Sequence, residues 1–264
     1  MERSMSEEKL TQWSISRMQA YELCPYRVKL QYIEKKPGRT SKSAHRGSTI
    51  HKEAEDFITG KAEFNDHLKH FYPEFEALRM QFDKGNVTCE EEWGFTQAWE
   101  EAPWNTAWLR MKCDCVVRLK NNTLLIVDFK TGQRHGNEVK HQQQLQLYAV
   151  AGLVRYPEIE NIICELWYLD KNVLTRFSLP RSEMAKHLDY FTKIGLRICS
   201  ETEFAPNPNL HSCRWCPYNG KDEEQQECEN AVKVEEVKIE VPEGYIPNEE
   251  AKAAAEAFLA SFQQ

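Results

Sequence analysis

The sequence lacks any long apolar run and is poor in glycine and proline. Its 264 residues include 11 glycines and 11 prolines, and 41% are hydrophobic, which excludes collagen and wholesale disorder. No apolar stretch approaches the roughly 18 residues that a membrane-spanning helix needs. Residues 1–10 carry acidic side chains where a secretory signal would be apolar, so we expect a cytoplasmic protein without a membrane partner.

The cysteines do not form the even, regularly spaced set of a disulfide framework. There are nine of them, unevenly distributed along the chain. In a reducing compartment such a set predicts buried thiols or metal ligands, and their spacing must distinguish the two.

A strongly basic overall charge is also missing, because the formal net charge is -7. The acidity is concentrated in residues 222–250, which hold eleven acidic side chains and two lysines, so the remainder of the chain is slightly basic. Residues 27–46 contain seven lysines and arginines against the single Glu34. This segment could neutralise several phosphates of a nucleic acid, and a solvated basic loop is the alternative.

Hydrophobic periodicity predicts helices towards both ends of the chain and strands between them. The predicted helices cover residues 13–32 with a break at Pro25, 47–60, 65–82 with an interruption at Pro73, 140–156 and 181–200. The predicted strands cover residues 87–95, 107–119, 123–129, 162–169 and 173–179. Asn121-Asn122 is a hairpin turn between two of these strands. This order predicts an α/β core with a mixed central sheet flanked by helices.

Three charged residues occur at the ends of apolar strands. Asp128 and Lys130 follow an apolar run and alternate onto one face. Asp114 stands between Cys113 and Cys115, so we expect it to point away from both and to reach the face of Asp128. Two neighbouring carboxylates need a cation, and oxygen ligands favour Mg²⁺ or Mn²⁺. The alternative is a salt bridge between Lys130 and either aspartate.

Three consecutive acids on the first predicted strand, Glu90, Glu91 and Glu92, leave two interpretations open. One of them could face the same site. A run of three acids is more typical of an exposed sheet edge.

Six short motifs occur in order between residues 13 and 218. They are Ser14-x-Ser16 with Tyr21-x-x-Cys24-Pro25, Gly47-x-x-x-His51, Cys113-Asp114 with Val116 and Val117, Ile126-Val127-Asp128-Phe129-Lys130-Thr131-Gly132, Gln144-x-x-x-Tyr148, and Cys213-x-x-Cys216-Pro217-Tyr218. In this order they resemble the PD-(D/E)XK nuclease superfamily, in particular its RecB-type and CRISPR-associated iron-sulfur exonuclease branch. The resemblance implies a restriction-endonuclease-like core with a metal-clasped helical subdomain built from both ends of the domain.

The resemblance also implies roles for individual residues. His51, Asp114, Asp128 and the backbone carbonyl of Phe129 would hold Mg²⁺ or Mn²⁺, and Asp114, Asp128 and Lys130 would be catalytic. Lys130 would orient or deprotonate the attacking water. The expected DNA-binding residues are Gln144, Tyr148, Arg46 and Arg134.

The implied activity is that of a metal-dependent DNA nuclease, an exonuclease rather than an endonuclease, acting in recombination, DNA processing or a phage-like replication context. One alternative is a catalytically silent DNA-binding or scaffold subunit that keeps the nuclease fold. A zinc-stapled interaction protein is a third hypothesis, and it would need no acidic site.

By the same resemblance, Cys24, Cys213, Cys216 and Cys228 would hold a 4Fe-4S cluster that joins the two ends of the domain. Cys228 follows Cys216 after eleven residues, a longer gap than the family pattern has. His211 is therefore an alternative fourth ligand, and it would suit zinc better. Buried thiols without a metal are the third possibility.

These expectations divide the chain into four parts. Residues 1–50 and 201–230 would form the cysteine-cluster subdomain, residues 51–200 the nuclease core, and residues 231–264 an acidic linker with a short helix. The tail could dock a recombination or replication protein. A disordered, solubilising tail is the alternative.

Overall fold

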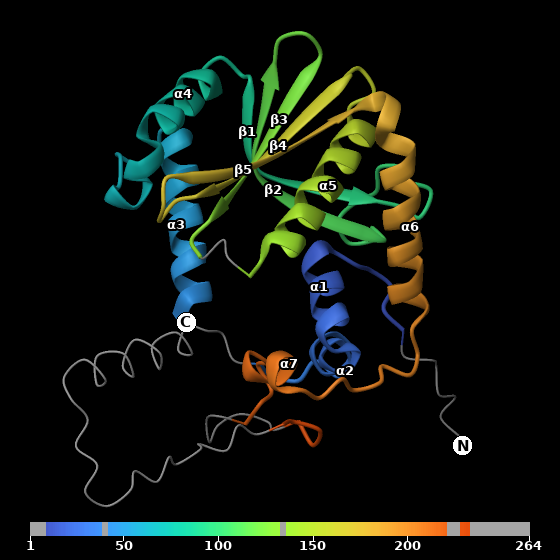
Figure 1. The fold of residues 1–264 in the computed structure, drawn as a ribbon. Helices are drawn as coiled ribbons and strands as arrows, with labels where there is room; N and C mark the ends of the chain where they lie inside the picture. Colours follow the sequence, from blue (N-terminus) through green and yellow to red (C-terminus); the bar gives the residue numbers. More distant parts are fainter. Residues whose placement is uncertain (1–8, 39–41, 133–135, 221–227, 233–264) are drawn as a thin grey trace, which may run out of the picture. The chain divides into compact units, whose positions relative to one another are not determined.

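A five-stranded mixed sheet forms the centre of the computed structural model (Figure 1). The structure describes residues 9–38, 42–132, 136–220 and 228–232, all within one compact unit, Met1–Val232. The strands lie in the order of the chain: β1 (Val87–Phe95), β2 (Leu109–Leu119), β3 (Thr123–Lys130), β4 (Asn161–Tyr168) and β5 (Val173–Pro180). β3 and β4 are parallel, and the other neighbouring pairs are antiparallel. The predicted mixed sheet flanked by helices is confirmed.

Helices cover both faces of this sheet. The long helices are α3 (Lys42–Ile58), α4 (Tyr72–Phe82), α5 (Glu138–Arg155) and α6 (Met184–Ser200). α3 and α4 lie on one face, and α5 and α6 lie on the other (Figure 1). Two apolar cores result, which we call the α3/α4 core, with Ile50 and Phe75, and the α5/α6 core, with Leu145 and Phe191.

The parallel pairing of β3 and β4 follows from the helix between them. Two adjacent parallel strands need a crossover, and α5 supplies it with apolar residues such as Leu145 and Leu153, both fully buried. The antiparallel pair β2 and β3 needs only a short turn. Asn121 and Asn122 form this predicted hairpin with left-handed φ angles of 56° and 49°, which asparagine tolerates better than most residues.

Both ends of the described unit meet beside the helices α1 (Ile15–Leu23), α2 (Pro25–Val28) and α7 (Leu210–Arg214). The first turn of α2 begins at Pro25, which ends α1 as predicted. The Asn207 amide donates to the Leu23 carbonyl at 3.0 Å, and the Tyr218 hydroxyl donates to the Lys36 carbonyl at 3.1 Å. The π-helical turn η1 (Lys29–Ile33) continues the chain from α2.

Short 3₁₀ helices precede two of the longer helices. The predicted helix over residues 65–82 is divided into η2 (Asp66–Phe71) and α4, with Pro73 in the first turn of α4, where its missing N–H costs nothing. Similarly, η3 (Arg181–Glu183) leads into α6. α3 starts at Lys42, earlier than the predicted start at residue 47.

Strand alternation breaks in the middle of β1 and β2, which contradicts the expected orientation of Asp114. Cys113 lies in the α5/α6 core, whereas Cys115 lies in the α3/α4 core, so Asp114 does not point away from both. The same change of face occurs along β1. Glu90 causes it there, because its φ of 55° places a non-glycine residue in the left-handed region.

Several predicted features lie outside the described residues. They are Arg134, the acidic insert at residues 221–227, and the tail with the helix expected near residues 251–262. Within the described part of the chain, no helix has the length and apolarity needed to span a membrane.

Gly195 allows α6 to lie against two tryptophans that fix the segment leading into α1. Trp13 and Trp108 pack edge to face, with ring centroids 5.5 Å apart. The backbone N–H of Trp13 also donates a hydrogen bond to the Trp108 carbonyl at 2.7 Å. A Cβ at Gly195 would lie 2.4 Å from Trp13 Nε1 and 2.5 Å from the Trp108 ring, closer than real contacts allow.

We therefore predict that Gly195→Ala destabilises the protein despite the better helix propensity of alanine. Overpacking costs about 1–3 kcal/mol, whereas the gain in propensity is about 1 kcal/mol. Urea unfolding followed by circular dichroism measures the difference. Leu196→Ala is the control, because Leu196 is 44% exposed on the same helix. A Gly195→Ala protein as stable as the wild type would contradict this packing.

Candidate metal centre and cysteine pocket

Three potential metal ligands converge from three elements of the fold. His51 of α3, Glu90 of β1 and Asp114 of β2 each place one ligand atom within 4.8 Å of the others. They line an open cleft of about 610 Å³ together with residues of α3 and with Lys112 of β2. One imidazole and two carboxylates in an open cleft are a donor set that suits Mg²⁺ or Mn²⁺.

The backbone of Glu90 explains how a residue of an edge strand reaches this cleft. In the β1–β2 register, Cys89 pairs with Cys115 and Glu91 pairs with Cys113, so Glu90 stands opposite Asp114. Its left-handed conformation costs about 1–3 kcal/mol for a non-glycine residue. The Glu90 carboxylate also forms an ion pair with Lys112.

Asp114 is held from two sides. Its Oδ2 accepts a hydrogen bond from the Phe129 backbone N–H at 2.7 Å and lies 3.2 Å from His51 Nδ1. Burial and the nearby charge of Asp128 raise the pKa of Asp114, although His51 opposes the shift. Burial disfavours the charged imidazole of His51, but the hydrogen bond to Asp114 and the charges of Asp114 and Asp128 together outweigh burial and raise the pKa of His51. The pair therefore shares a site where a positive charge is favoured.

Asp128 is fixed from the opposite face, by α5. Its Oδ1 accepts hydrogen bonds from Gln144 Nε2 at 2.7 Å and from the Tyr148 hydroxyl at 3.1 Å, and its Oδ2 forms an ion pair with Lys130. Asp128 is only 4% exposed. Burial and then the charge of Asp128 raise the pKa of Tyr148 well above its ordinary value, so this hydroxyl keeps its proton.

The structure thus brings His51, Asp114, Asp128 and Lys130 to one region, as the sequence predicts, but in two groups. The three-ligand group contains Glu90 and does not contain Asp128. The role of the Phe129 carbonyl as a ligand stays a prediction. In the structure, the Phe129 backbone N–H donates a hydrogen bond to Asp114.

Sequence reasoning left Glu90 among three equivalent acids. In the structure, Glu92 is exposed, and Glu91 contacts Arg155 and the Tyr156 hydroxyl, so neither belongs to the three-ligand group. Strand alternation could not separate them, because the left-handed turn at Glu90 breaks that alternation. The usable signal was the position of Glu90 opposite Asp114 in an antiparallel pair.

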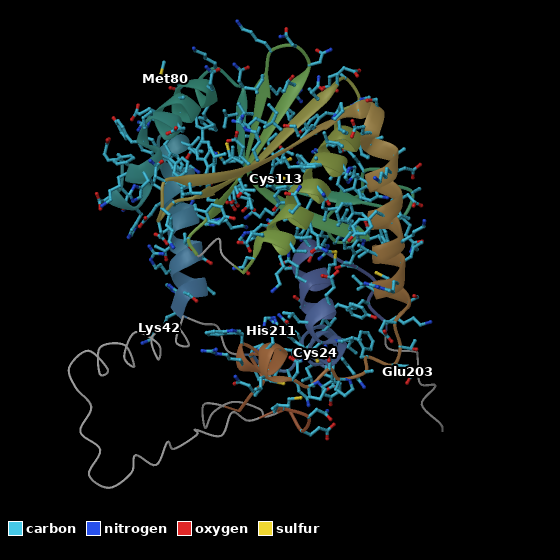
Figure 2. All side chains as sticks on the ribbon, in the orientation of Figure 1. Cys24, Lys42, Met80, Cys113, Glu203 and His211 are labelled. Atoms are coloured by element: carbon cyan, nitrogen blue, oxygen red, sulfur yellow. The ribbon has the colours of Figure 1, made fainter. Side chains whose placement is uncertain are left out.

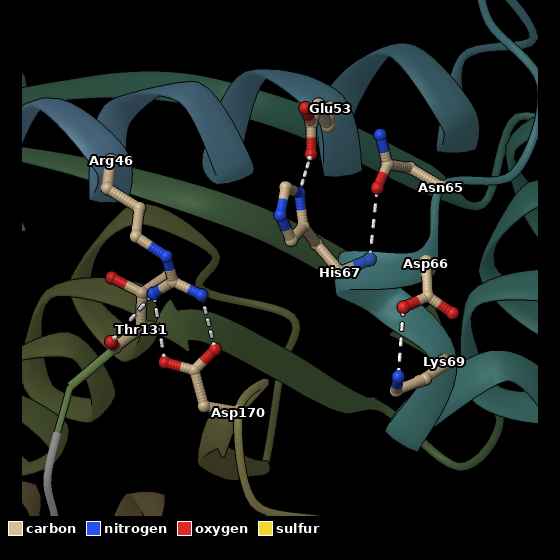
Figure 3. Close-up of polar contacts among 8 residues, drawn as sticks. All are labelled: Arg46, Glu53, Asn65, Asp66, His67, Lys69, Thr131 and Asp170. Atoms are coloured by element: carbon tan, nitrogen blue, oxygen red, sulfur yellow. Dashed lines mark hydrogen bonds and ion pairs between the residues drawn. The ribbon is translucent and has the colours of Figure 1, made fainter.

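The expected DNA-binding residues have different surroundings. Gln144 and Tyr148 are 8% and 3% exposed, and they brace Asp128 rather than Lys130. Arg46 is held by Asp170 through two bonds of 3.0 Å and 2.7 Å and by the Thr131 carbonyl at 3.3 Å (Figure 3). These contacts fix α3 to the loop regions beside β3 and β4. DNA binding by these three residues stays a prediction.

The four predicted cluster cysteines line a single pocket between α1, α2, α7 and the chain that follows it. The pocket includes Cys24, Cys213, Cys216 and Cys228. Burial raises the pKa of Cys216 and of Cys228, and the charges of the neighbouring cysteines raise both further. His211, which is labelled together with Cys24 in Figure 2, is exposed and is not part of the pocket lining.

Comparison with known proteins identifies a sequence family. The family described as the PD-(D/E)XK nuclease superfamily matches residues 12–220. No protein of curated function matches this sequence significantly.

Three examples represent the solved structures that are similar to the chain. SSO0001 has 13% sequence identity and a TM-score of 0.43, over 85% of this chain and 89% of that chain. A candidate exonuclease from Eubacterium rectale has 10% identity and a TM-score of 0.43, over 75% and 85%. An alkaline exonuclease from Laribacter hongkongensis has 12% identity and a TM-score of 0.28, over 72% and 91%.

The geometry predicts that Glu90→Gln weakens Mn²⁺ binding by about tenfold or more, since even residues that only support a metal ligand contribute 10–100-fold. Isothermal titration calorimetry of the full chain with MnCl₂ measures this affinity. Glu92→Gln removes the same charge from an exposed position on the same strand, and it should leave the affinity unchanged. Equal affinities for the two variants would exclude Glu90 as a ligand.

Proposed function

Because the chain belongs to the PD-(D/E)XK nuclease superfamily, we propose that it is a divalent-metal-dependent deoxyribonuclease that hydrolyses phosphodiester bonds from DNA ends. The observation that carries this proposal is the placement of the His51, Glu90 and Asp114 group in an open cleft. Lys130 and Asp128 lie close enough that their charges act on His51. A purely structural salt bridge would not need an imidazole and two further carboxylates around a cleft.

The donor set fits Mg²⁺ or Mn²⁺. His51, Glu90 and Asp114 would hold the ion, and the like charges of Asp114 and Asp128 favour a cation between α3 and β2. When bound, such an ion polarises a phosphoryl oxygen and lowers the pKa of a water molecule.

The remaining residues act on the substrate and on each other. The Lys130 side chain is 22% exposed, whereas the side chain of its partner Asp128 is 6% exposed, so the ammonium lies at the border between the core and solvent. There it can orient the attacking water and offset the negative charge that develops on the phosphoryl oxygens. Gln144 and Tyr148 keep the Asp128 carboxylate in place, which in turn positions Lys130.

Removal of DNA from its ends, and a role in recombination or DNA processing, are the finer parts of this proposal. A catalytically silent DNA-binding subunit of the same fold is the alternative. The contacts of Asp128 and Lys130 favour the enzyme, because a silent subunit has no need for a buried carboxylate beside an ammonium and a metal-ligand group.

We predict that Asp114→Asn lowers the rate of DNA hydrolysis by at least about a hundredfold, since it removes a metal ligand and the partner of His51. Degradation of end-labelled linear DNA with Mg²⁺ or Mn²⁺, and with EDTA as a blank, measures the rate. Asp189→Asn is the matched control, because Asp189 is exposed on α6 and its ion pair within the described part of the chain is with Lys193, away from the cleft.

Covalently closed circular DNA distinguishes attack at ends from internal cleavage. Resistance of the circle with degradation of the linear form supports an exonuclease. Wild-type protein that binds DNA but cleaves neither form with either metal would establish the silent subunit instead.

We further propose that Cys24, Cys213, Cys216 and Cys228 bind a 4Fe-4S cluster with a structural role. Their common pocket supports this, since thiolates from both ends of the unit would hold the two ends together. The exposed position of His211 favours Cys228 as the fourth ligand. Zinc held by the same residues is the alternative.

Anaerobic purification tests the cluster. Wild-type protein should be brown, with about four irons per chain if one 4Fe-4S cluster is bound. Cys228→Ser should lose most of the visible absorbance, whereas His211→Ala should keep it. Colourless wild-type protein with stoichiometric zinc would contradict the cluster.

A further inference from the structure

A second cleft, of about 360 Å³, adjoins the candidate metal centre along β2. The polar and aromatic side chains that line it include Ser14, Ser16, Arg17, Tyr32, Trp104 and Arg110. Lys112 lines both clefts. Tyr148, which binds Asp128, also lines the second cleft and donates to the Lys112 carbonyl at 3.1 Å. The two clefts are therefore neighbours on either side of Lys112.

Two guanidinium groups in the second cleft rest on aromatic rings. Arg17 lies 4.3 Å from the centroid of the Tyr32 ring, and Arg110 lies 5.1 Å from that of Trp104. Stacking of this kind holds a guanidinium in place and leaves its N–H edges available. Arg17 uses one N–H to bind the Gln12 carbonyl at 2.8 Å.

Neither arginine forms an ion pair with any residue that the structure describes, whereas Arg46, Arg118, Arg155 and Arg176 each form one. Glu92 is the acid whose charge reaches Arg110, but at a distance beyond an ion pair. Burial lowers the pKa of Arg110, and the charge of Arg17 lowers it further. Arg110 Nε is buried and has no hydrogen-bond partner in the described part of the chain. Two like charges thus share a cleft that contains no counter-charge of its own.

Two hydroxyls complete the polar lining. Ser14 Oγ and Ser16 Oγ lie 3.0 Å apart, and Ser14 Oγ also accepts from the Arg17 backbone N–H at 3.3 Å. One hydrogen bond between the two hydroxyls occupies only one of their two O–H donors. The other remains available to an oxygen in the cleft. Two guanidinium groups and one hydroxyl are donors of the kind that a phosphate accepts.

We propose that this second cleft binds a phosphate group of the DNA strand that is cleaved at the metal centre, a few nucleotides away from the bond that is hydrolysed. The proposal deepens the proposed function and rests on it. The exposed ring of Trp104, 36% accessible, supplies a face on which the adjacent base can stack. Arg110, Lys112 and Asp114 follow one another along β2, so the phosphate cleft and the metal centre lie about 14 Å apart along the strand. At about 3.4 Å of rise per stacked nucleotide, this spacing corresponds to a few nucleotides.

Arg110→Ala tests the proposal through binding alone, without a requirement for hydrolysis. We expect the affinity for a single-stranded oligonucleotide in EDTA, measured by fluorescence anisotropy, to fall about tenfold, since a charge-assisted contact to phosphate is lost. The slope of log affinity against log salt concentration should decrease by about 0.7, the value for one phosphate contact with single-stranded DNA.

Arg118→Ala is the matched control. Arg118 lies on the same strand and stacks on Tyr156 at 4.7 Å, but it is paired with Glu158 and lies outside both clefts. Ser16→Ala is the second variant, on an exposed side chain, and it should weaken binding in the same direction. The proposal would be overturned if the Arg110→Ala and Ser16→Ala proteins bound the oligonucleotide with the same affinity as the Arg118→Ala protein.

A comparison of substrates shows whether the bound phosphate is at an end of the strand or within it. Oligonucleotides with a 5′-phosphate, a 5′-hydroxyl or a 3′-phosphate, and a circular single strand, are compared for wild type and Arg110→Ala. A loss confined to one phosphorylated end identifies a terminal phosphate, and an equal loss on all of them identifies an internal one. Since EDTA prevents metal-dependent hydrolysis, failure of the nuclease proposal would appear only in the cleavage assay.

Discussion

The site depends on the close approach of two carboxylates, Asp114 and Asp128, in a region largely closed to solvent. Two buried like charges are unfavourable unless each has its own compensation. The fold provides this from opposite faces of the sheet. His51 and the Phe129 N–H stabilise Asp114 from the side of α3, whereas Lys130 and the polar groups of α5 stabilise Asp128. Each carboxylate therefore depends on a different face of the sheet for its compensation.

This arrangement explains why α5 carries polar residues in an otherwise apolar surface. Gln144 and Tyr148 lie one helical turn apart among fully buried residues such as Leu145 and Ala149. Their polar groups are paired there with Asp128, with each other and, for Tyr148, with the Lys112 carbonyl, and such pairing is needed because a buried amide or hydroxyl without a partner is costly. The crossover helix that makes β3 and β4 parallel thereby also fixes the orientation of the second carboxylate. Sheet topology and site geometry are consequences of the same segment.

Much of the fold could be predicted from periodicity, since the strands and the crossover helix have clear apolar patterns and the turn at Asn121-Asn122 has the residues that it requires. The motif residues His51, Asp114, Asp128 and Lys130 could be predicted as neighbours for the same reason. Glu90 could not be chosen, because one left-handed residue changes the face of a strand and no local pattern announces it. Trp104, which is 36% exposed at the second cleft, is another residue whose position no local pattern indicates.

Lys112 connects the chemistry of the two clefts. Its ammonium pairs with Glu90 on the metal side, and its carbonyl accepts from Tyr148, which in turn binds Asp128. The backbone of β2 therefore fixes the distance between the metal ligand Asp114 and Arg110 in the second cleft. Because β2 lies between β1 and β3 in the sheet, this distance is not free to vary as it would on a loop. A rigid spacing between a phosphate-binding cleft and a metal centre is what an enzyme needs to place one bond of a flexible strand, and not its neighbours, at the point of hydrolysis.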